Sequence, residues 1–249
     1  DYGNYGSQIK RNIEQSWWKY FVNSREDIVG IDGAIITHPQ VWKASGHTES
    51  FSDPLVECKK CHKRFRADQL IESALGIYVD GMSREQIQDI LNKHKIKCPD
   101  CKGDFTLVKM FNLMFKTYVG AVEDETSIAY LRPETAQLIF TNFKQILTTS
   151  RKKLPFGIAQ IGRAFRNEIS PRNFVFRTRE FSQMEIEYFI HPKKINECPY
   201  LDSEHKNMEL NVLTADAKKH QKMKISELLK EKTIKTPWHA YWIAESVRW

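Results

Sequence analysis

The stretch that decides the fold reads Phe165-Arg166-Asn167-Glu168, then Arg177-Thr178-Arg179-Glu180-Phe181, then Met184-Glu185-Ile186-Glu187-Tyr188-Phe189. Charged and apolar residues alternate along it, which predicts two strands joined by a loop at 170–173. Residues two apart share one face of a strand. The predicted same-face sets are Arg166 with Glu168, Arg177 with Arg179, and Phe181 with Gln183, Glu185 and Glu187.

A sheet face that carries arginines, an aromatic ring and carboxylates suits a phosphorylated nucleotide. The planar fork of arginine matches phosphate, and an aromatic ring beside it can stack on a base. The plain alternative is a solvated, salt-bridged sheet face, which is what charge runs usually mean. The pattern Phe-Arg-x-Glu, loop, Arg-x-x-x-Phe-x-x-x-Glu favours the first interpretation, because it resembles the second signature motif of class II aminoacyl-tRNA synthetases.

The resemblance extends upstream of this motif. Arg132-Pro133-Glu134-Thr135-Ala136-Gln137 resembles the amino-acid-binding segment of glycyl-tRNA synthetases, and residues 110–117 and 123–125 match the same family. Residues 30–33, 37–39 and 42–47 resemble its first motif, the helix-strand unit of the dimer interface. The matches cover most of residues 1–190 and are closest to the homodimeric form of the enzyme.

The resemblance implies a cytoplasmic glycine–tRNA ligase. It would activate glycine with ATP to glycyl-adenylate and pyrophosphate, and then transfer glycine to the 3′ end of its tRNA. Mg²⁺ would bridge the phosphates. The implied ATP-binding residues are Arg166, Asn167, Glu168, Phe176, Arg177, Thr178, Arg179, Glu180 and Phe181. The implied glycine-binding residues are Arg66, Glu134, Phe181, Ser182, Gln183, Met184 and Glu185.

Within these sets the resemblance implies separate roles. Arg166 would bind the α-phosphate, Arg177 would reach the outer phosphates, and Phe181 would stack on adenine. Glu134 and Glu185 would hold the ammonium group of glycine. Arg66 is included because Phe65-Arg66-Ala67-Asp68 resembles a segment of the same family, although a solvated arginine is the plain alternative.

The chain departs from the family pattern in two respects. Leu138 stands where the family usually has glycine, which affects local packing rather than chemistry. No third motif, the Gly-rich segment that ends in Glu-Arg and completes the ATP site, can be found, and neither can an anticodon-binding domain. We therefore expect a partial chain of a longer enzyme.

Four of the five cysteines form two Cys-x-x-Cys pairs, Cys58 with Cys61 and Cys98 with Cys101. Two such turns can present four thiolates to one tetrahedral zinc ion. The alternative is four reduced cysteines that never meet a metal. His62 and His94 could replace a cysteine ligand but are expected at the surface. Between the pairs, Ser83 and Gln86 form a capping-box pattern that predicts the start of a helix.

Composition limits the function classes. At 249 residues the chain can bury one large core with small insertions, and its net charge of +7 suits a polyanionic partner such as tRNA. It has no apolar run long enough to span a membrane and no signal-peptide pattern. Paired cysteines of this kind argue against a secreted disulfide framework.

The predicted fold class is α+β, a mainly antiparallel sheet flanked by helices, with insertions. The predicted division is 1–57 (catalytic core with motif 1), 58–109 (cysteine insertion), 110–190 (core with motif 2), 191–235 (lysine-rich insertion) and 236–249 (core). A helix is expected over residues 7–22 with a mostly core-facing stripe, a strand over 28–36 that is broken by glycines, and a helix after Pro237.

The lysine-rich insertion holds Lys218, Lys219, Lys222 and Lys224. It is expected to be a solvated helical segment, with tRNA contact as the alternative. Cys198, the fifth cysteine, is expected to be inert.

Two rival functions remain open at this point. One is a non-catalytic, synthetase-like accessory or nucleic-acid-binding subunit, although such relatives usually lose motif residues that are present here. The other is a class II synthetase for proline, threonine or serine, against which the segment 132–137 speaks.

Overall fold

The computed structural model describes residues 2–171, 173–214 and 219–249, so Arg172 and Lys218 lie outside the described residues. The chain forms two compact units: unit 1 contains residues 31–143 and 160–185, and unit 2 contains residues 2–30, 144–159 and 186–249. Helices accompany small sheets whose pairings are antiparallel except for β1 with β8. The predicted α+β class is confirmed.

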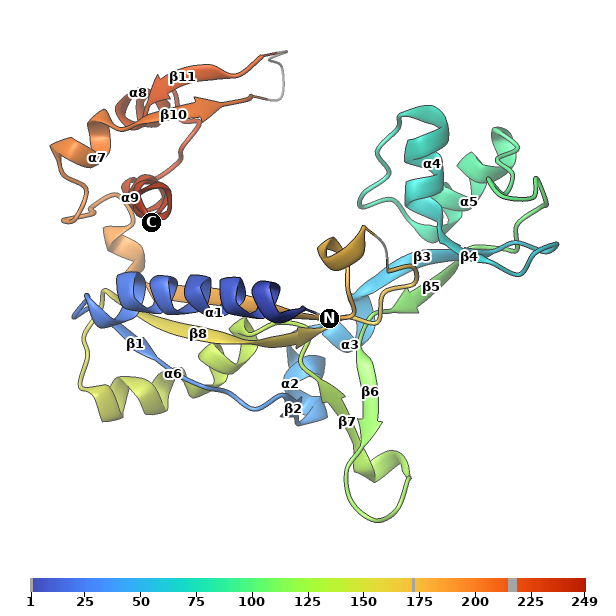
Figure 1. Ribbon diagram of the computed structural model, residues 1–249, viewed down its shortest axis with the longest axis horizontal. Coiled ribbons are helices and arrows are strands. Elements are labelled where there is room, and N and C mark those ends of the chain that lie inside the picture. Colours follow the sequence, from blue (N-terminus) through green and yellow to red (C-terminus); the bar gives the residue numbers. More distant parts are fainter. Residues whose placement is uncertain (1, 172, 215–218) are drawn as a thin grey trace. The chain divides into compact units, whose positions relative to one another are not determined.

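The cysteine insertion in unit 1 has a sheet and a core of its own. The sheet has the order β4-β3-β5, and α4 and α5 lie over one of its faces (Figure 1). Ile71, Ile87 and Leu91 of these helices pack with Val56 of the sheet. The Ser83–Gln86 capping box is present as predicted. The bounds are β3 Ser52–Glu57, β4 Arg64–Arg66, α4 Ala67–Leu75, α5 Arg84–Lys93 and β5 Lys109–Asn112.

A second sheet in unit 1 has the order β2-β7-β6. The expected strand 28–36 is wrong as a single element, because it splits into β1 and β2 of different sheets. The residues between them bond elsewhere: the Arg132 N–H donates to the Ile35 carbonyl at 3.0 Å. The bounds are β2 Ile36–Thr37, α2 Pro39–Ala44, α3 His47–Ser50, β6 Phe115–Tyr118, a 3₁₀ turn Glu125–Ser127, β7 Ile128–Leu131 and α6 Ala136–Ser150.

Leu138, which stands where the family usually has glycine, is accommodated on α6 by a glycine opposite it. It is buried, and a Cβ built on Gly33 would lie 2.6 Å from Leu138 Cδ1. Glycine at position 33 therefore leaves the space that the leucine side chain fills.

The motif-2 stretch forms a hairpin of β8 (Phe156–Phe165) and β9 (Glu180–Phe189). The predicted strand through Arg166–Glu168 is wrong. β8 ends at Phe165, and the Glu168 N–H turns back to the Arg166 carbonyl at 2.7 Å. Residues 166–179 form the connection, with a 3₁₀ turn at Phe174–Phe176. The predicted alternation of faces applies along β9. It does not apply to the pairs Arg166–Glu168 and Arg177–Arg179, because these residues lie outside both strands.

Unit 2 opens with α1 (Asn4–Trp18), which continues as a π-helical turn, Lys19–Asn23. The helix is confirmed, but its stripe is core only at its end: Trp17 and Phe21 are buried, whereas Ile9 and Ile13 are 58% and 43% exposed. β1 (Ile28–Gly30) pairs in parallel with the start of β8.

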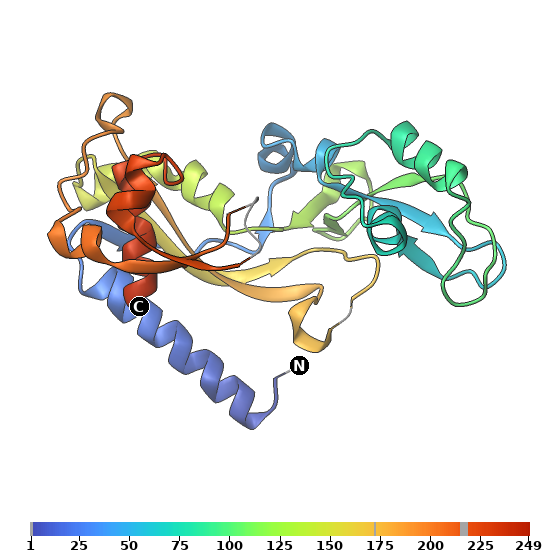
Figure 2. The same cartoon turned by 90° about the horizontal axis from the view of Figure 1, so that it is seen from above.

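The lysine-rich insertion, predicted as helical, contains two short helices with a β-hairpin between them, so the prediction is correct only in part. β10 (Glu209–Val212) and β11 (Gln221–Lys224) pair, and this hairpin lies beside the C-terminal helix, drawn in red in Figure 2. Leu210, Val212 and Met223 of the hairpin pack on the core formed by α8 and α9. α9 begins at Pro237 as predicted. The remaining bounds are a 3₁₀ turn Pro192–Lys194, α7 Ser203–Asn207, α8 Ile225–Lys230 and α9 Pro237–Arg248. Among the described residues, no helix is long and apolar enough to cross a membrane.

Candidate functional site

The Arg-Pro-Glu-Thr segment meets the working face of β9 at Thr135. The Thr135 N–H donates to Gln183 Oε1 at 3.2 Å, and its hydroxyl donates to Glu185 Oε2. Thr135 is fully buried, so these contacts fix the segment on the strand. Gln183 and Glu185 lie two apart on β9, which is why both reach the same partner.

Arg132 anchors the same segment to two neighbouring stretches of backbone. Its side chain is 2% exposed, with Nε donating to the Arg163 carbonyl and Nη1 to the Gly33 carbonyl, each at 2.6 Å. A buried guanidinium bonded to backbone carbonyls holds the chain in place rather than facing a ligand. The Arg132 side chain thereby fixes the position of the backbone at Glu134, two residues further along.

Glu134 is supported by two neighbours at the site. Gln137 Nε2 donates to its Oε1 at 3.1 Å, and His47 Nε2 lies 3.5 Å from the same oxygen. His47 is itself oriented by the Ser45 hydroxyl, 2.8 Å from its Nδ1. The carboxylate keeps enough exposure to meet a cationic ligand.

Arg166 lies between two aromatic rings. Its Cζ is 5.5 Å from the centroid of Phe51 and 5.2 Å from that of Phe181, and Nε donates to the Pro133 carbonyl at 3.2 Å. Cation–π contacts hold a guanidinium without neutralising its charge. Arg166 is therefore a positioned cation next to the Arg-Pro-Glu-Thr segment.

Arg66 and Arg177 belong to an ion-pair cluster with three carboxylates. Asp53 Oδ2 lies 2.6 Å from Arg66 Nη1 and 4.0 Å from Arg177 Nη2. Burial raises the pKa of the Asp53 carboxyl; Arg66 opposes this, while the charges of Asp68 and Glu168 add to it. Burial lowers the pKa of Arg66, but its pairing with Asp68 and Asp53 gives a net rise.

The other predicted ATP-site residues lie outside these contacts. Asn167 donates its N–H to the Leu113 carbonyl, the Thr178 hydroxyl donates to the Glu180 carbonyl, and Glu180 pairs with Arg163. Phe176 is 94% exposed. Arg179 Nε donates to the Glu168 carbonyl at 3.1 Å, which braces the loop. Ser182 and Met184 alternate with Phe181, Gln183 and Glu185 and so face the opposite side of β9.

Sequence reasoning missed three residues that the structure brings to the site: His47, Phe51 and Asp53. All three follow Trp42 in a segment that we interpreted only as part of the first motif. The sequence carried no local signal for these roles, because Phe51 and Asp53 contact arginines that lie far along the chain.

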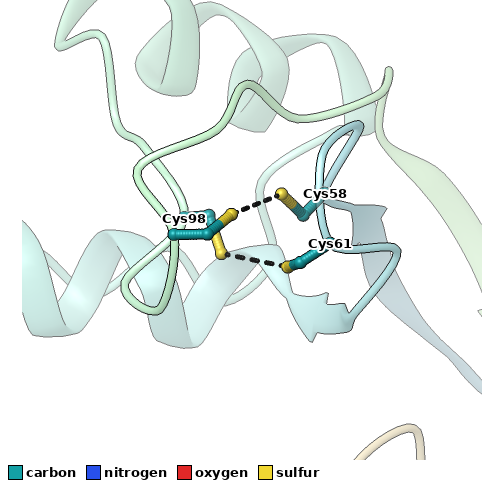
Figure 3. A group of neighbouring side chains, drawn as sticks. Cys58, Cys61 and Cys98 are labelled. Carbon is teal, nitrogen blue, oxygen red and sulfur yellow. Dashed lines mark hydrogen bonds between the residues drawn. The ribbon is translucent and has the colours of Figure 1, made fainter.

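The four paired cysteines meet in the insertion (Figure 3). Their sulfurs all lie within 4.8 Å of one another, with Cys58 Sγ 3.4 Å from Cys101 Sγ and Cys61 Sγ 3.7 Å from Cys98 Sγ. Both turns have the same bonding: the N–H of His62 donates to the Cys58 carbonyl and that of Lys102 to the Cys98 carbonyl, each at 2.9 Å. His62 and Lys102 both adopt positive φ. The turns are thus two copies of one knuckle.

The cluster favours one thiolate, at Cys58, and the crowded sulfurs disfavour further negative charge in the absence of a cation. The backbone N–H groups of Cys61 and Lys60 lower the pKa of the Cys58 thiol to about 6. The Lys63 N–H acts likewise on Cys61, but burial and the neighbouring sulfurs raise that pKa to about 12. A Cβ on Gly103 would lie 3.0 Å from Cys58 Sγ, so only glycine leaves the sulfurs room. His62 pairs with Glu57 and is not in the cluster.

The chain is similar in sequence to known aminoacyl-tRNA synthetases. Residues 115–206 match the family profile of the tRNA synthetase class II core domain (G, H, P, S and T). Glycine–tRNA ligase of Agathobacter rectalis is 54% identical over 200 residues, covering 77% of this chain and 43% of the relative. That of Caldanaerobacter subterraneus subsp. tengcongensis is 56% identical over 198 residues, with the same two coverages. The ligase of Ureaplasma urealyticum is 55% identical over 193 residues, covering 76% of this chain and 41% of the relative.

The chain thus spans less than half the length of these curated relatives. A solved structure of the RNA-binding domain of threonyl-tRNA synthetase from Cryptosporidium parvum is 17% identical, with a TM-score of 0.43 over 77% of this chain and 32% of that one. On the strength of the sequence relatives and the core-domain match, this chain belongs to the class II aminoacyl-tRNA synthetases, with the glycine–tRNA ligases as its relatives.

Proposed function

We propose that this chain carries the amino-acid-activating site of a glycine–tRNA ligase. The observation that carries the proposal is the meeting of the Arg-Pro-Glu-Thr segment with β9 through Thr135, which gathers Glu134, Gln183 and Glu185 beside Arg166. Carboxylates suit an ammonium group, and a positioned guanidinium suits a phosphate.

The reaction follows from these groups. A carboxylate oxygen of glycine attacks the α-phosphorus of MgATP, the bond from that phosphorus to the β-phosphate oxygen breaks, and pyrophosphate leaves. The product is glycyl-adenylate. A ribose hydroxyl at the 3′ end of the tRNA then attacks its carbonyl carbon, and AMP leaves. Such a transition state needs positive charge around the phosphorus more than it needs an acid or a base.

The nucleotide side of the site is formed by the motif-2 residues. Arg166 would bind the α-phosphate, since it is held by aromatic rings rather than by a carboxylate. Phe181 would exchange its contact with Arg166 for adenine. Arg177 would reach the outer phosphates from its pairing with Glu168. Asn167, Glu168, Phe176, Thr178, Arg179 and Glu180 complete the proposed nucleotide set.

The glycine side is formed by two carboxylates. Glu134 and Glu185 would hold the ammonium group, with Phe181 and Gln183 beside them on the same face of β9. Ser182 and Met184 would support that face from the other side of the strand, and Arg66 completes the proposed set. Glycine offers no side chain to grip, so selectivity would depend on excluding larger amino acids.

We also propose that the cysteine knuckles hold a structural zinc ion. Cys58, Cys61, Cys98 and Cys101 offer four sulfurs within 4.8 Å, the number and type that tetrahedral zinc prefers. Protein purified without chelator should carry about one zinc per chain. Absence of metal from such protein, or zinc retained by a Cys98→Ser and Cys101→Ser variant, would contradict this.

A homodimer that binds tRNA in the cytoplasm completes the proposal. Tyr5, Ile9 and Ile13 lie four residues apart on α1 and are exposed, an apolar stripe that suits a second copy. Lys219, Lys222 and Lys224 on the lysine-rich hairpin are exposed and suit an RNA backbone.

The test is amino-acid-dependent pyrophosphate exchange with the full natural polypeptide across the amino acids. Glycine should support exchange far better than alanine or serine. Preferential use of proline, threonine or serine would overturn the glycine assignment. Exchange with none of them would favour a non-catalytic accessory subunit.

A further inference from the structure

The ion-pair cluster of unit 1 contains more carboxylates than its arginines need. Asp68 alone engages Arg66 at two nitrogens, Nε at 3.1 Å and Nη2 at 2.5 Å. On the other side, Glu168 Oε2 takes Arg177 Nε at 2.8 Å and Nη2 at 2.7 Å. Each arginine therefore already has a carboxylate of its own.

Asp53 is the third carboxylate, and both arginines share it. It lies 2.6 Å from Arg66 Nη1 and 4.0 Å from Arg177 Nη2. Its place is set by the sheet: Leu55 of β3 is opposite Arg66 of β4, and Asp53 is two residues from Leu55 on the same face. On its other edge Asp53 pairs with Phe111 of β5.

A buried charge that neutralises no orphaned partner is unfavourable for folding. Asp53 adds repulsion toward Asp68 and Glu168, and burial disfavours its charged form. Asp53 nevertheless lies between the two arginines, paired closely with Arg66 and at the outer limit of ion-pair distance from Arg177. It fixes the distance and orientation between them.

We propose that Asp53 is a positioning residue that holds Arg66 and Arg177 in one arrangement, so that the amino-acid end and the phosphate end of the site are organised together. This rests on the proposed function, in which Arg66 belongs to the glycine side and Arg177 to the phosphate side. The role couples the cysteine insertion, which supplies Arg66, to the motif-2 loop, which supplies Arg177.

The decisive variant is Asp53→Asn in the full natural polypeptide, because it keeps the size of the side chain and removes the charge. We expect the KM for ATP and the KM for glycine each to rise about tenfold, the scale of coupling within one ion-pair network. The melting temperature should stay the same or rise, since each arginine keeps its own carboxylate.

Asp27→Asn in unit 2 is the matched control. Asp27 is similarly buried, with 18% side-chain exposure against 13% for Asp53, and it also receives two nitrogens of an arginine, Arg25, at 2.9 and 2.8 Å. This variant should melt lower than the wild type with both KM values unchanged.

Two results would overturn the proposal: an Asp53→Asn variant that melts lower while both KM values stay unchanged, or one in which the KM of a single substrate rises. Calorimetric binding of a non-hydrolysable ATP analogue tests the Arg177 side whichever amino acid is activated. An enzyme that activates another amino acid would refute the proposed function, and the second KM is then measured with that amino acid.

Discussion

Each unit of the molecule contains a buried arginine–carboxylate network, and the two differ in how completely their charges are satisfied. In unit 2, Arg25 donates to Asp27 and, through Nη1, to the Tyr241 hydroxyl at 2.6 Å and Glu245 at 3.3 Å. Its guanidinium also lies over the rings of Tyr241 and Trp242. In unit 1, Arg66 and Arg177 are bound by carboxylates along one side and remain partly exposed.

The two aspartates, Asp27 of unit 2 and Asp53 of unit 1, show the difference most clearly. Burial alone raises the pKa of the Asp27 carboxyl. The hydrogen bonds from Arg25 and the Tyr188 hydroxyl lower the pKa by more than burial raises it, so the net change is downward. The pKa of Asp53 is raised. A lowered pKa means that the charge stabilises the folded state at neutral pH, and a raised one means that the charge destabilises it. The charge of Asp27 in unit 2 therefore stabilises the fold, whereas the charge of Asp53 in unit 1 does not, which fits the proposed assignment of the unit 1 arginines to substrate binding.

Replacing Arg25 should have the largest effect on stability. Arg25→Met keeps much of the side-chain volume but leaves Asp27 and Glu245 without their cation. We expect the free energy of unfolding to fall by about 3 kcal/mol, as when a buried pair loses one partner. Denaturant unfolding measures this. A loss within the range of ordinary surface substitutions would remove the distinction between the two networks.

Replacing Arg166 should affect catalysis most. Arg166→Ala removes the positioned cation, and we expect glycine-dependent pyrophosphate exchange to fall by about 100- to 1,000-fold. Because Arg166 is held by two rings rather than by a carboxylate, no buried charge is left unpaired and the melting temperature should change little. Near-normal exchange would show that the α-phosphate is bound elsewhere.

Replacing Glu134 should weaken the binding of glycine but not that of ATP. Glu134→Gln keeps size and hydrogen bonding but removes the charge, so glycine binding should weaken by about 2 kcal/mol, the scale of a charge-assisted hydrogen bond. ATP binding should be little changed, because the proposed phosphate-binding residues are Arg166 and Arg177 rather than Glu134. Equal weakening of both substrates would refute the assignment of Glu134 to the ammonium group.

The smallest effect concerns acid pH. Because the folded pKa of Asp27 is lowered, its contribution to stability is fully present above the unfolded value of about 3.9 and is lost as pH falls through the folded value. Below about pH 4 the wild type should therefore lose stability more steeply than Asp27→Asn. A series of melting curves from pH 7 to pH 3 checks this, and parallel curves would contradict it.

Most of the features that were predicted correctly could be recognised from short stretches of sequence. The Arg-Pro-Glu-Thr segment, the motif-2 arginines, the Ser83 capping box and the cysteine knuckles depend on short spacings and were recognisable. The end of β8 was not, because alternation continues past Phe165 while the Glu168 N–H turns back to the Arg166 carbonyl. The lysine-rich hairpin was missed because its lysine content favoured a solvated helix, although its strands pair locally, Val212 with Gln221.

His47, Phe51 and Asp53 could not be found from the sequence because their roles depend on contacts across the fold. Phe51 meets Arg166, and Asp53 meets both Arg66 and Arg177. No spacing along the chain encodes these contacts. They arise only once β3 is paired with β4 and the motif-2 loop has returned to it.

The most direct test of the contrast between the units is hydrogen exchange of the full natural polypeptide with and without glycyl-sulfamoyl-adenosine, a stable mimic of the adenylate. Binding should slow amide exchange in residues 47–53, 132–137 and 180–185 of unit 1, and leave residues 25–27 and 241–248 of unit 2 unchanged. Slowed exchange confined to the unit 2 segments, or none in either unit, would contradict the assignment of the substrate site to unit 1.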